Sequence, residues 1–140
     1  MIERRVSLRC TRSRAFQLFT EHAGEWWPHD LRHTDDQGSE IRILAEGRFF
    51  ERAGDGTEVE LGRVTAWEPP ARIDLDFYPG TGVDHPTLLT VRFEEEGAGT
   101  LVHVTHRPGP ASEELWSERA TGYDRAWTLV FEALADPRSW

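Results

Sequence analysis

A histidine at the end of an alternating apolar run is the residue best suited to acid–base chemistry. Val102, Val104 and His106 occupy every second position, so in a β-strand their side chains point to the same face. An imidazole with an unperturbed pKa of about 6.5 transfers protons near neutral pH. The alternative is a structural histidine, hydrogen-bonded near the end of the sheet, because the sequence shows no partner for proton transfer. His106 is therefore a candidate, and we assign no catalytic residue.

A second chemical candidate is Arg63, which could recognise an anionic group. Strict alternation places it on the same strand face as Leu61 and Trp67, and Trp67 favours an inward orientation for that face. A guanidinium inside or at the rim of a cavity suits an anionic ligand through paired hydrogen bonds. The alternatives are a surface arginine, or one that pairs with Glu51 or Asp76.

Aromatic side chains supply the remaining candidate ligand contacts. The chain has six Trp and seven Phe, and each such side chain buries about 150 to 250 Å². Trp116, Tyr123 and Trp127 share one face of a predicted helix, where they could serve the core, a ligand or both. The predicted ligand-binding residues are Trp27, Phe49, Arg63, Trp67, Phe77, His106, Tyr123 and Trp127.

The sequence gives little support for a metal site or for covalent catalysis. His29 and His33 are four residues apart, but they follow Pro28 in a polar loop, so this spacing need not bring the imidazoles together. Cys10 lacks an identifiable base, and neither a nucleophile-elbow serine nor a glycine-rich phosphate loop occurs. We expect no metal and no cofactor.

Composition limits the partners and the compartment. The net charge of −9 opposes binding to nucleic acid and to an anionic membrane surface. No segment approaches the roughly 18 apolar residues that span a bilayer, and the single cysteine and the polar N-terminus predict a cytoplasmic protein. The length of 140 residues predicts one domain over 1–140.

The elements that must position these residues follow from periodicity. A strand is predicted over 3–10, a helix over 12–20 and a single helical turn before Pro28. Alternating runs separated by Gly and Pro turns predict further strands near 40–45, 47–53, 58–68, 71–78, 87–95 and 100–107. Apolar residues at steps of three and four predict a long helix over 112–135, within which Gly122 suggests a close backbone approach.

This order predicts an α+β fold. A curved seven-stranded antiparallel sheet, with two short N-terminal helices, wraps around the long C-terminal helix, which must bury its apolar stripe against the concave face. Side chains seldom fill the open end between the two layers, so we expect a cavity there.

Five segments then carry a family resemblance that covers nearly the whole chain: Ala15–Thr20 with Trp26-Trp27-Pro28, Gly47–Arg52 with Asp55-Gly56, Gly62–Ile73, Thr100–His106, and Gly122-Tyr123-Asp124 with Trp127. In this order they resemble the START-like helix-grip (SRPBCC) superfamily, and within it the Hsp90-ATPase-activator-homologue-1-like family. The resemblance implies the helix-grip fold more firmly than an activity, because members include lipid carriers, cyclases, hydrolases, binding proteins and a co-chaperone domain.

Three functions remain open at this stage. The leading hypothesis is a binding protein whose aromatic cavity holds a small apolar or amphipathic molecule, oriented by His106 or Arg63. The first alternative is a hydrolase or cyclase in which His106 moves a proton. The second is a co-chaperone-like interaction module, which requires a filled cavity and an exposed apolar patch. A homodimer is also left open.

Overall fold

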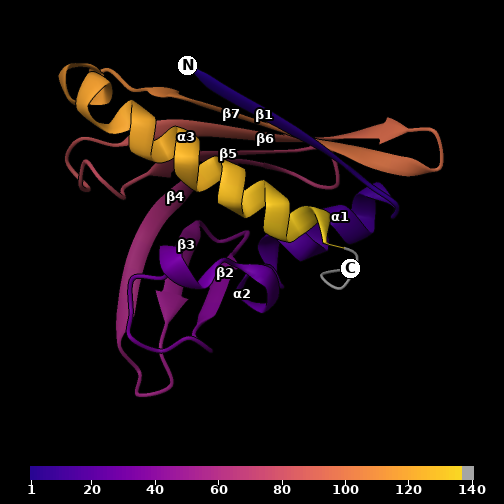
Figure 1. Cartoon of the computed structure of the whole chain (residues 1–140), viewed down its shortest axis with the longest axis horizontal. Coiled ribbons are helices and arrows are strands. Elements are labelled where there is room, and N and C mark those ends of the chain that lie inside the picture. Colours follow the sequence, from indigo (N-terminus) through magenta and orange to yellow (C-terminus); the bar gives the residue numbers. More distant parts are fainter. Residues whose placement is uncertain (137–140) are drawn as a thin grey trace.

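The computed structural model describes residues 1–136, which form one antiparallel sheet packed against helices (Figure 1). The sheet has the strand order β1-β7-β6-β5-β4-β3-β2. Its strands are β1 (Ile2–Leu8), β2 (Glu40–Ile43), β3 (Arg48–Arg52), β4 (Glu58–Glu68), β5 (Arg72–Phe77), β6 (Thr87–Glu96) and β7 (Gly99–Pro108). The helices are α1 (Arg12–Thr20), α2 (Ala23–Trp26) and α3 (Glu113–Ala135), with a 3-10 turn, η1, at His29–Leu31. The predicted seven-stranded helix-grip architecture is confirmed.

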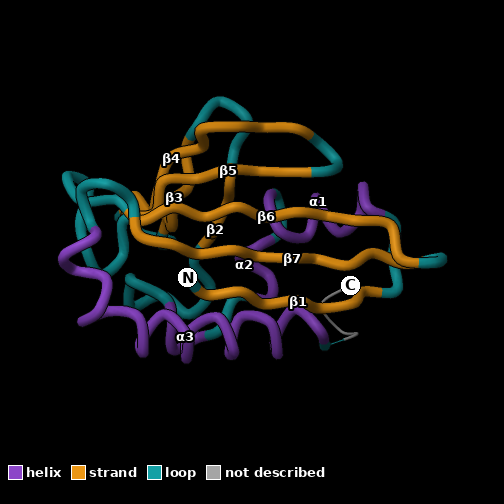
Figure 2. Tube along the Cα trace, turned by 90° about the horizontal axis from the view of Figure 1, so that it is seen from above, coloured by secondary structure: helices purple, strands orange, loops and turns teal. Residues whose placement is uncertain are grey.

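The sheet is strongly bent. In Figure 1, β2, β3 and the lower half of β4 turn away from β1, β6 and β7, and Figure 2 shows α3 running along one side of the strands. The strand β4 belongs to both parts, because its first residues pair with β3 and its last residues with β5. Register shifts between Phe49 and Phe50 and between Val64 and Ala66 interrupt these pairings. Such bulges increase the local twist and bend of a strand.

The core lies on the inner face of the sheet, between the strands and the helices. Alternation along β5, β6 and β7 sends every second side chain to this face. Seven apolar residues at such alternate positions are buried: Ile73, Leu75, Leu89, Val91, Phe93, Val102 and Val104. The alternating pattern therefore predicted the orientation of these three strands correctly.

Two short helices close one end of this core. Thr11 caps α1 by accepting a hydrogen bond from the backbone N–H of Arg14, at 3.2 Å. The ring of Phe16 then packs edge-on against Trp67, with centroids 5.0 Å apart. Trp26 ends α2 and donates its indole N–H to the carbonyl oxygen of Leu18 at 2.8 Å. These contacts fix the segment that leads into η1.

The long helix α3 lies on the same face as α1. Its buried stripe consists of Tyr123, Trp127, Val130, Phe131 and Leu134, which follows the three- and four-residue period predicted for it. The expectation of a close backbone approach at Gly122 is wrong, because a Cβ added there would meet no heavy atom within 4 Å. None of the described helices combines the length and apolar character needed to span a bilayer.

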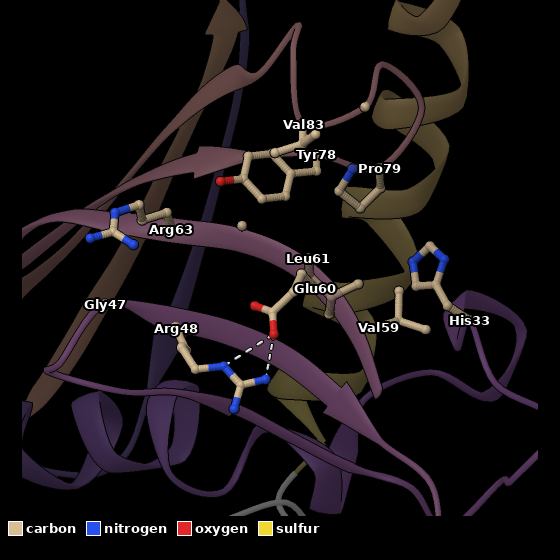
Figure 3. Close-up of a pocket in the computed structure, with 12 residues that line it drawn as sticks. His33, Gly47, Arg48, Val59, Glu60, Leu61, Arg63, Tyr78, Pro79 and Val83 are labelled. Atoms are coloured by element: carbon tan, nitrogen blue, oxygen red, sulfur yellow. Dashed lines mark hydrogen bonds and ion pairs between the residues drawn. The ribbon is translucent and has the colours of Figure 1, made fainter. Parts of the chain in front are cut away.

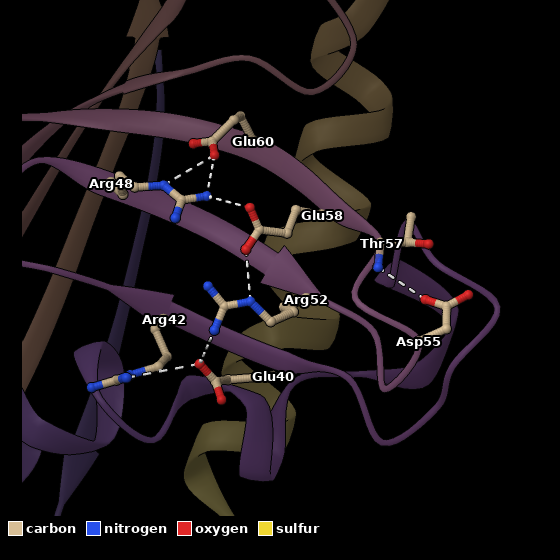
Figure 4. A network of polar contacts seen from close by, with 8 residues as sticks. All are labelled: Glu40, Arg42, Arg48, Arg52, Asp55, Thr57, Glu58 and Glu60. Carbon is tan, nitrogen blue, oxygen red and sulfur yellow. Dashed lines mark hydrogen bonds and ion pairs between the residues drawn. The ribbon is translucent and has the colours of Figure 1, made fainter.

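The outer face of β2, β3 and β4 is polar, although it covers one aromatic ring. Phe50 is buried on this face beneath Arg48 and Arg52, whose guanidinium carbons lie 4.2 and 4.9 Å from the ring centroid. The two arginines also form ion pairs with Glu40, Glu58 and Glu60 (Figure 4). Exposed ion pairs contribute little individually, but here they hold the guanidinium groups of the two arginines over the ring.

Candidate functional site

An aromatic pocket opens between α3, the end of β5 and the segment 27–33. We call it the helix pocket, and its volume is about 320 Å³. Most of its walls are apolar, and the polar side chains of Asp30, Arg32 and His33 come from the loop. Its lining residues are Trp27, Asp30, Leu31, Arg32, His33, Phe77, Pro79, Tyr123, Ala126, Trp127 and Val130. The pocket therefore lies between α3, the end of β5 and the loop that follows Trp27.

Four of the predicted ligand-binding residues line this pocket. They are Trp27 from the loop, Phe77 from β5, and Tyr123 and Trp127 from α3. Their rings are close to one another, with centroids 6.3 Å apart for Phe77 and Tyr123 and 6.4 Å apart for Phe77 and Trp127. Phe49 lies behind them, 6.2 Å from Phe77 and 6.4 Å from Trp27. Side chains distant in sequence thus form one aromatic group.

Polar contacts hold the helical side of this group in place. Tyr123 donates its hydroxyl hydrogen to the carbonyl oxygen of Pro79 at 2.7 Å. Trp127 donates its indole N–H to Nδ1 of His106 at 3.0 Å. Both aromatic side chains are thereby tied to the sheet side of the pocket, which reduces the rotamer entropy that a ligand would otherwise have to remove.

His106 itself is fully buried, with 0% of its surface exposed. Because an indole N–H can only donate, Nδ1 must accept and carries no proton. The neutral ring then bears its proton on Nε2, which donates to Oγ1 of Thr87 at 2.7 Å. Burial, with a smaller contribution from the positively charged N-terminus, lowers the pKa of His106 to about 3. His106 is therefore neutral near pH 7, both of its nitrogens are occupied, and it is not among the residues that line the helix pocket.

Arg63 and Trp67 lie away from the helix pocket and on opposite faces of the sheet. The pairing of Arg63 with Asp76, and of Trp67 with Ile73, shows that the bulge near Val64 inserts one extra residue between them. Strict alternation, which put both side chains on one face, is therefore wrong here. Trp67 packs inward against α1, whereas Arg63 is exposed on the outer face.

The segment that follows Trp27, predicted from the sequence as a polar loop, forms the polar side of the pocket. Arg32 donates to the carbonyl oxygens of Ser39 and Gly24, both at 2.7 Å. Burial lowers the pKa of Arg32, while the charges of Glu51 and Asp36 oppose this effect. The side chain of Arg32 thus joins the loop to α2 and to the residue that precedes β2.

A buried carboxylate, Glu51, anchors the same loop to β3. It is 0% exposed and accepts hydrogen bonds from the backbone N–H groups of His33 and Thr34, at 2.8 and 2.9 Å. The hydroxyls of Thr34 and Ser39 donate to it as well, at 2.6 and 3.0 Å. Burial by itself raises the pKa of Glu51, but these hydrogen bonds outweigh it and hold the pKa below its ordinary value. The inward position of Glu51, two residues after Phe49, was the available sequence signal.

The described residues contain no group of three or more His, Cys, Asp or Glu side chains that could hold a metal ion. His29 and His33 do not converge in such a group. The ring of His29 instead contacts the side-chain oxygen of Gln37 at 2.6 Å, and His33 is exposed at the edge of the helix pocket.

A curved sheet that grips a long C-terminal helix, with an aromatic pocket at its open end, defines a helix-grip protein. The chain belongs to one particular family of this class. The model of the activator of Hsp90 ATPase homolog 1-like protein family matches residues 9–138. The resemblance drawn from the five sequence segments is therefore confirmed. No curated protein matches the chain significantly.

Solved structures show the same fold at low sequence identity. The self-sacrificing resistance protein CalC from Micromonospora echinospora is 23% identical, with a TM-score of 0.72 over 96% of this chain and 91% of that one. The Aha1 dimer from Colwellia psychrerythraea is 14% identical, with a TM-score of 0.65 over 96% and 92%. The anthrahydroquino-gamma-pyrone synthase Txn09, complexed with SUM, is 24% identical, with a TM-score of 0.57 over 97% and 87%.

Proposed function

We propose that this protein binds a small apolar or amphipathic molecule in the helix pocket. The observation that carries the proposal is the convergence of Trp27, Phe77, Tyr123 and Trp127 on one pocket of about 320 Å³. Small-molecule sites are typically concave, lined mainly by apolar and aromatic side chains, and about 300 to 1,000 Å³ in volume. The helix pocket has these properties.

The distribution of polar groups indicates how such a ligand would be oriented. Asp30, Arg32 and His33 all come from the loop side of the pocket, whereas α3 contributes mainly aromatic and aliphatic surface. An apolar ring system would therefore lie against Trp127 and Phe77, with any polar substituent directed toward the loop. Phe49 contributes by supporting Phe77 and Trp27 from behind.

Filling the pocket should abolish binding of a neutral probe. Ala126 is a small side chain in the wall, so Ala126→Phe should place a ring in the space that a ligand needs. We expect this variant to weaken binding of N-phenyl-1-naphthylamine by about tenfold or more, since overlap with the added ring costs at least 1.4 kcal/mol. Probe fluorescence during titration measures the effect.

The matched control introduces the same side chain on the same helix outside the pocket. Ala135 is exposed at the end of α3, so Ala135→Phe should leave the affinity of the probe unchanged. Equal binding by both variants, or no binding of the probe to the unmodified protein, would refute a site in the helix pocket. Native mass spectrometry of the purified protein would show directly whether a ligand co-purifies with it.

The hydrolase or cyclase alternative finds its best support at a different histidine from the one predicted. His106 is neutral and has both nitrogens occupied, whereas His33 is exposed and lines the helix pocket. A proton-transferring enzyme at this site should lose turnover of its ligand in His33→Gln but keep its affinity for N-phenyl-1-naphthylamine. Loss of both, or of neither, would count against this role.

The interaction-module alternative requires an exposed apolar patch. Among the described residues, the large hydrophobic side chains exposed to solvent are Met1, at 71%, and Val83, at 64%. Two such side chains do not make a continuous apolar patch. The interaction-module hypothesis therefore has less support than the ligand-binding hypothesis. A homodimer and a cytoplasmic location stay predictions, which light scattering and cell fractionation would test.

A further inference from the structure

A second and larger hollow lies on the outer face of the sheet, on the side away from α3. We call it the sheet pocket, and its volume is about 550 Å³ (Figure 3). It forms because β4 extends beyond the end of β5. The last residue of β5, Phe77, is paired with Gly62. The part of β4 before Leu61 therefore pairs with β3 alone, and the chain after Tyr78 turns outward around the gap.

Below the sheet pocket, the backbone of β4 packs closely against the end of β5 and Tyr78. Tyr78 donates its backbone N–H to the carbonyl oxygen of Leu61 at 2.9 Å. At Gly62, an added Cβ would lie 2.2 Å from the carbonyl oxygen of Asp76, which is far inside van der Waals contact. Glycine is therefore required at this point, because the backbone of Asp76 occupies the position that a side chain would need.

The two arginines of the sheet pocket differ in their partners. The guanidinium of Arg48 is occupied by Glu58 and Glu60. Arg63 is exposed and has no hydrogen bond or ion pair among the described residues, although Asp76 is its cross-strand neighbour. Its guanidinium lies near Gly47, where an added Cβ would be 3.8 Å from the guanidinium carbon. Arg63 therefore places one positive charge, without an ion-pair partner among the described residues, beside the sheet pocket.

Apolar surface adjoins this charge. In Figure 3, Tyr78 and Val83 lie on one side of the hollow and Leu61 on its floor, with Arg63 at one end. Val83 is 64% exposed and is one of the two large hydrophobic side chains left open to solvent in the described part of the chain. A ligand that covers Val83 would remove apolar surface from water, which is favourable in proportion to the area buried.

We propose that the sheet pocket is a second binding site, separate from the helix pocket, for a small amphipathic monocarboxylate. The carboxylate pairs with the guanidinium of Arg63, and the apolar body lies against Tyr78, Leu61 and Val83. A planar carboxylate matches the two parallel donors of a guanidinium. Arg63 is the one arginine of the sheet pocket without a partner among the described residues, and the net charge of the chain is −9, so one negative charge on the ligand is favoured over two.

The test compares 2-naphthoate with its neutral isostere 2-naphthamide by nuclear magnetic resonance on the 15N-labelled protein. Naphthoate should shift the backbone amide signals of Gly47, Gly62 and Gly82, which all line the sheet pocket, and naphthamide should bind there more weakly. Arg63→Gln should reduce the affinity for naphthoate by about tenfold or more, because it removes a charge-assisted pair.

Arg92→Gln serves as the matched control. Arg92 is also an exposed outer-face arginine, on β6, and it does not line the sheet pocket. The proposal fails if Arg63→Gln binds naphthoate as tightly as Arg92→Gln does, or if naphthoate shifts only the indole signals of Trp27 and Trp127. That second outcome would place the carboxylate in the helix pocket and leave the proposed function intact.

Discussion

Replacement of Glu51 by leucine should lower the free energy of unfolding by about 3 kcal/mol. The change leaves the N–H groups of His33 and Thr34 and the hydroxyl of Ser39 without their acceptor, and each unsatisfied buried donor costs about 1 to 3 kcal/mol unless the loop opens to water. Urea denaturation would measure the loss. Hydrogen exchange should show faster exchange at the amides of His33 and Thr34.

The pH dependence of this effect has a definite sign. The hydrogen bonds lower the pKa of Glu51 in the folded protein, so its contribution is complete above the unfolded pKa of about 4.3 and is lost as the pH falls through the lower folded pKa. The difference between the unmodified protein and Glu51→Leu should therefore shrink in acid. Glu60→Leu is the control, because Glu60 makes an exposed ion pair with Arg48 and should contribute less than about 1 kcal/mol. Equal effects of the two substitutions would show that Glu51 does not anchor the loop.

Replacement of His106 by glutamine should cost about 2 to 4 kcal/mol of folding free energy. Glutamine cannot fill the ring's space while accepting from Trp127 and donating to Thr87, so a void or an unsatisfied polar group remains. The fluorescence of Trp127 should change because its indole N–H loses its acceptor. His85→Gln is the control, since His85 lies exposed in the loop between β5 and β6.

The same residue should make the protein less stable in weak acid. Burial lowers the pKa of His106 to about 3, whereas in the unfolded chain it is about 6.5. Above pH 6.5 neither state is protonated at this ring. As the pH falls from 6.5 toward 3, the unfolded chain takes up a proton that the folded chain does not, and stability declines by at most about 1.4 kcal/mol per pH unit. His106→Gln should lack this contribution. A folded-state pKa near 6.5 for His106, measured by NMR titration, would overturn both the structural role and this slope.

Regular periodicity explains which parts of the fold were predictable. The alternating residues of β5, β6 and β7 and the apolar stripe of α3 bury one face each, so their spacing directly reports their orientation. In β4, the bulge near Val64 reverses the faces of Gly62, Arg63 and Val64 relative to Trp67, and the second shift opposite Phe49 and Phe50 restores the original alternation before Leu61. A one-residue register shift of this kind leaves no mark on the pattern of residue types, so the outward position of Arg63 could not be read from the sequence.

The aromatic part of the helix pocket was predictable for the same reason, and its polar side was not. Phe77, Tyr123 and Trp127 lie at regular positions on β5 and α3. The loop is held differently, by hydrogen bonds from Arg32 to Gly24 and Ser39 and from the backbone of His33 to Glu51 on β3. Such contacts depend on tertiary packing and have no local signature. The sequence therefore predicted the aromatic faces of β5 and α3. It did not predict the position of the loop that the buried carboxylate of Glu51 holds in place.

Two residues, His33 and Pro79, line both the helix pocket and the sheet pocket. A ligand in either pocket that moves one of these side chains changes the walls of the other pocket. Thermodynamic linkage then makes the effect reciprocal: whatever factor the first ligand applies to the affinity of the second, the second applies to the first. Any such coupling would be measured by titrating the probe of one pocket in the presence and absence of the ligand of the other.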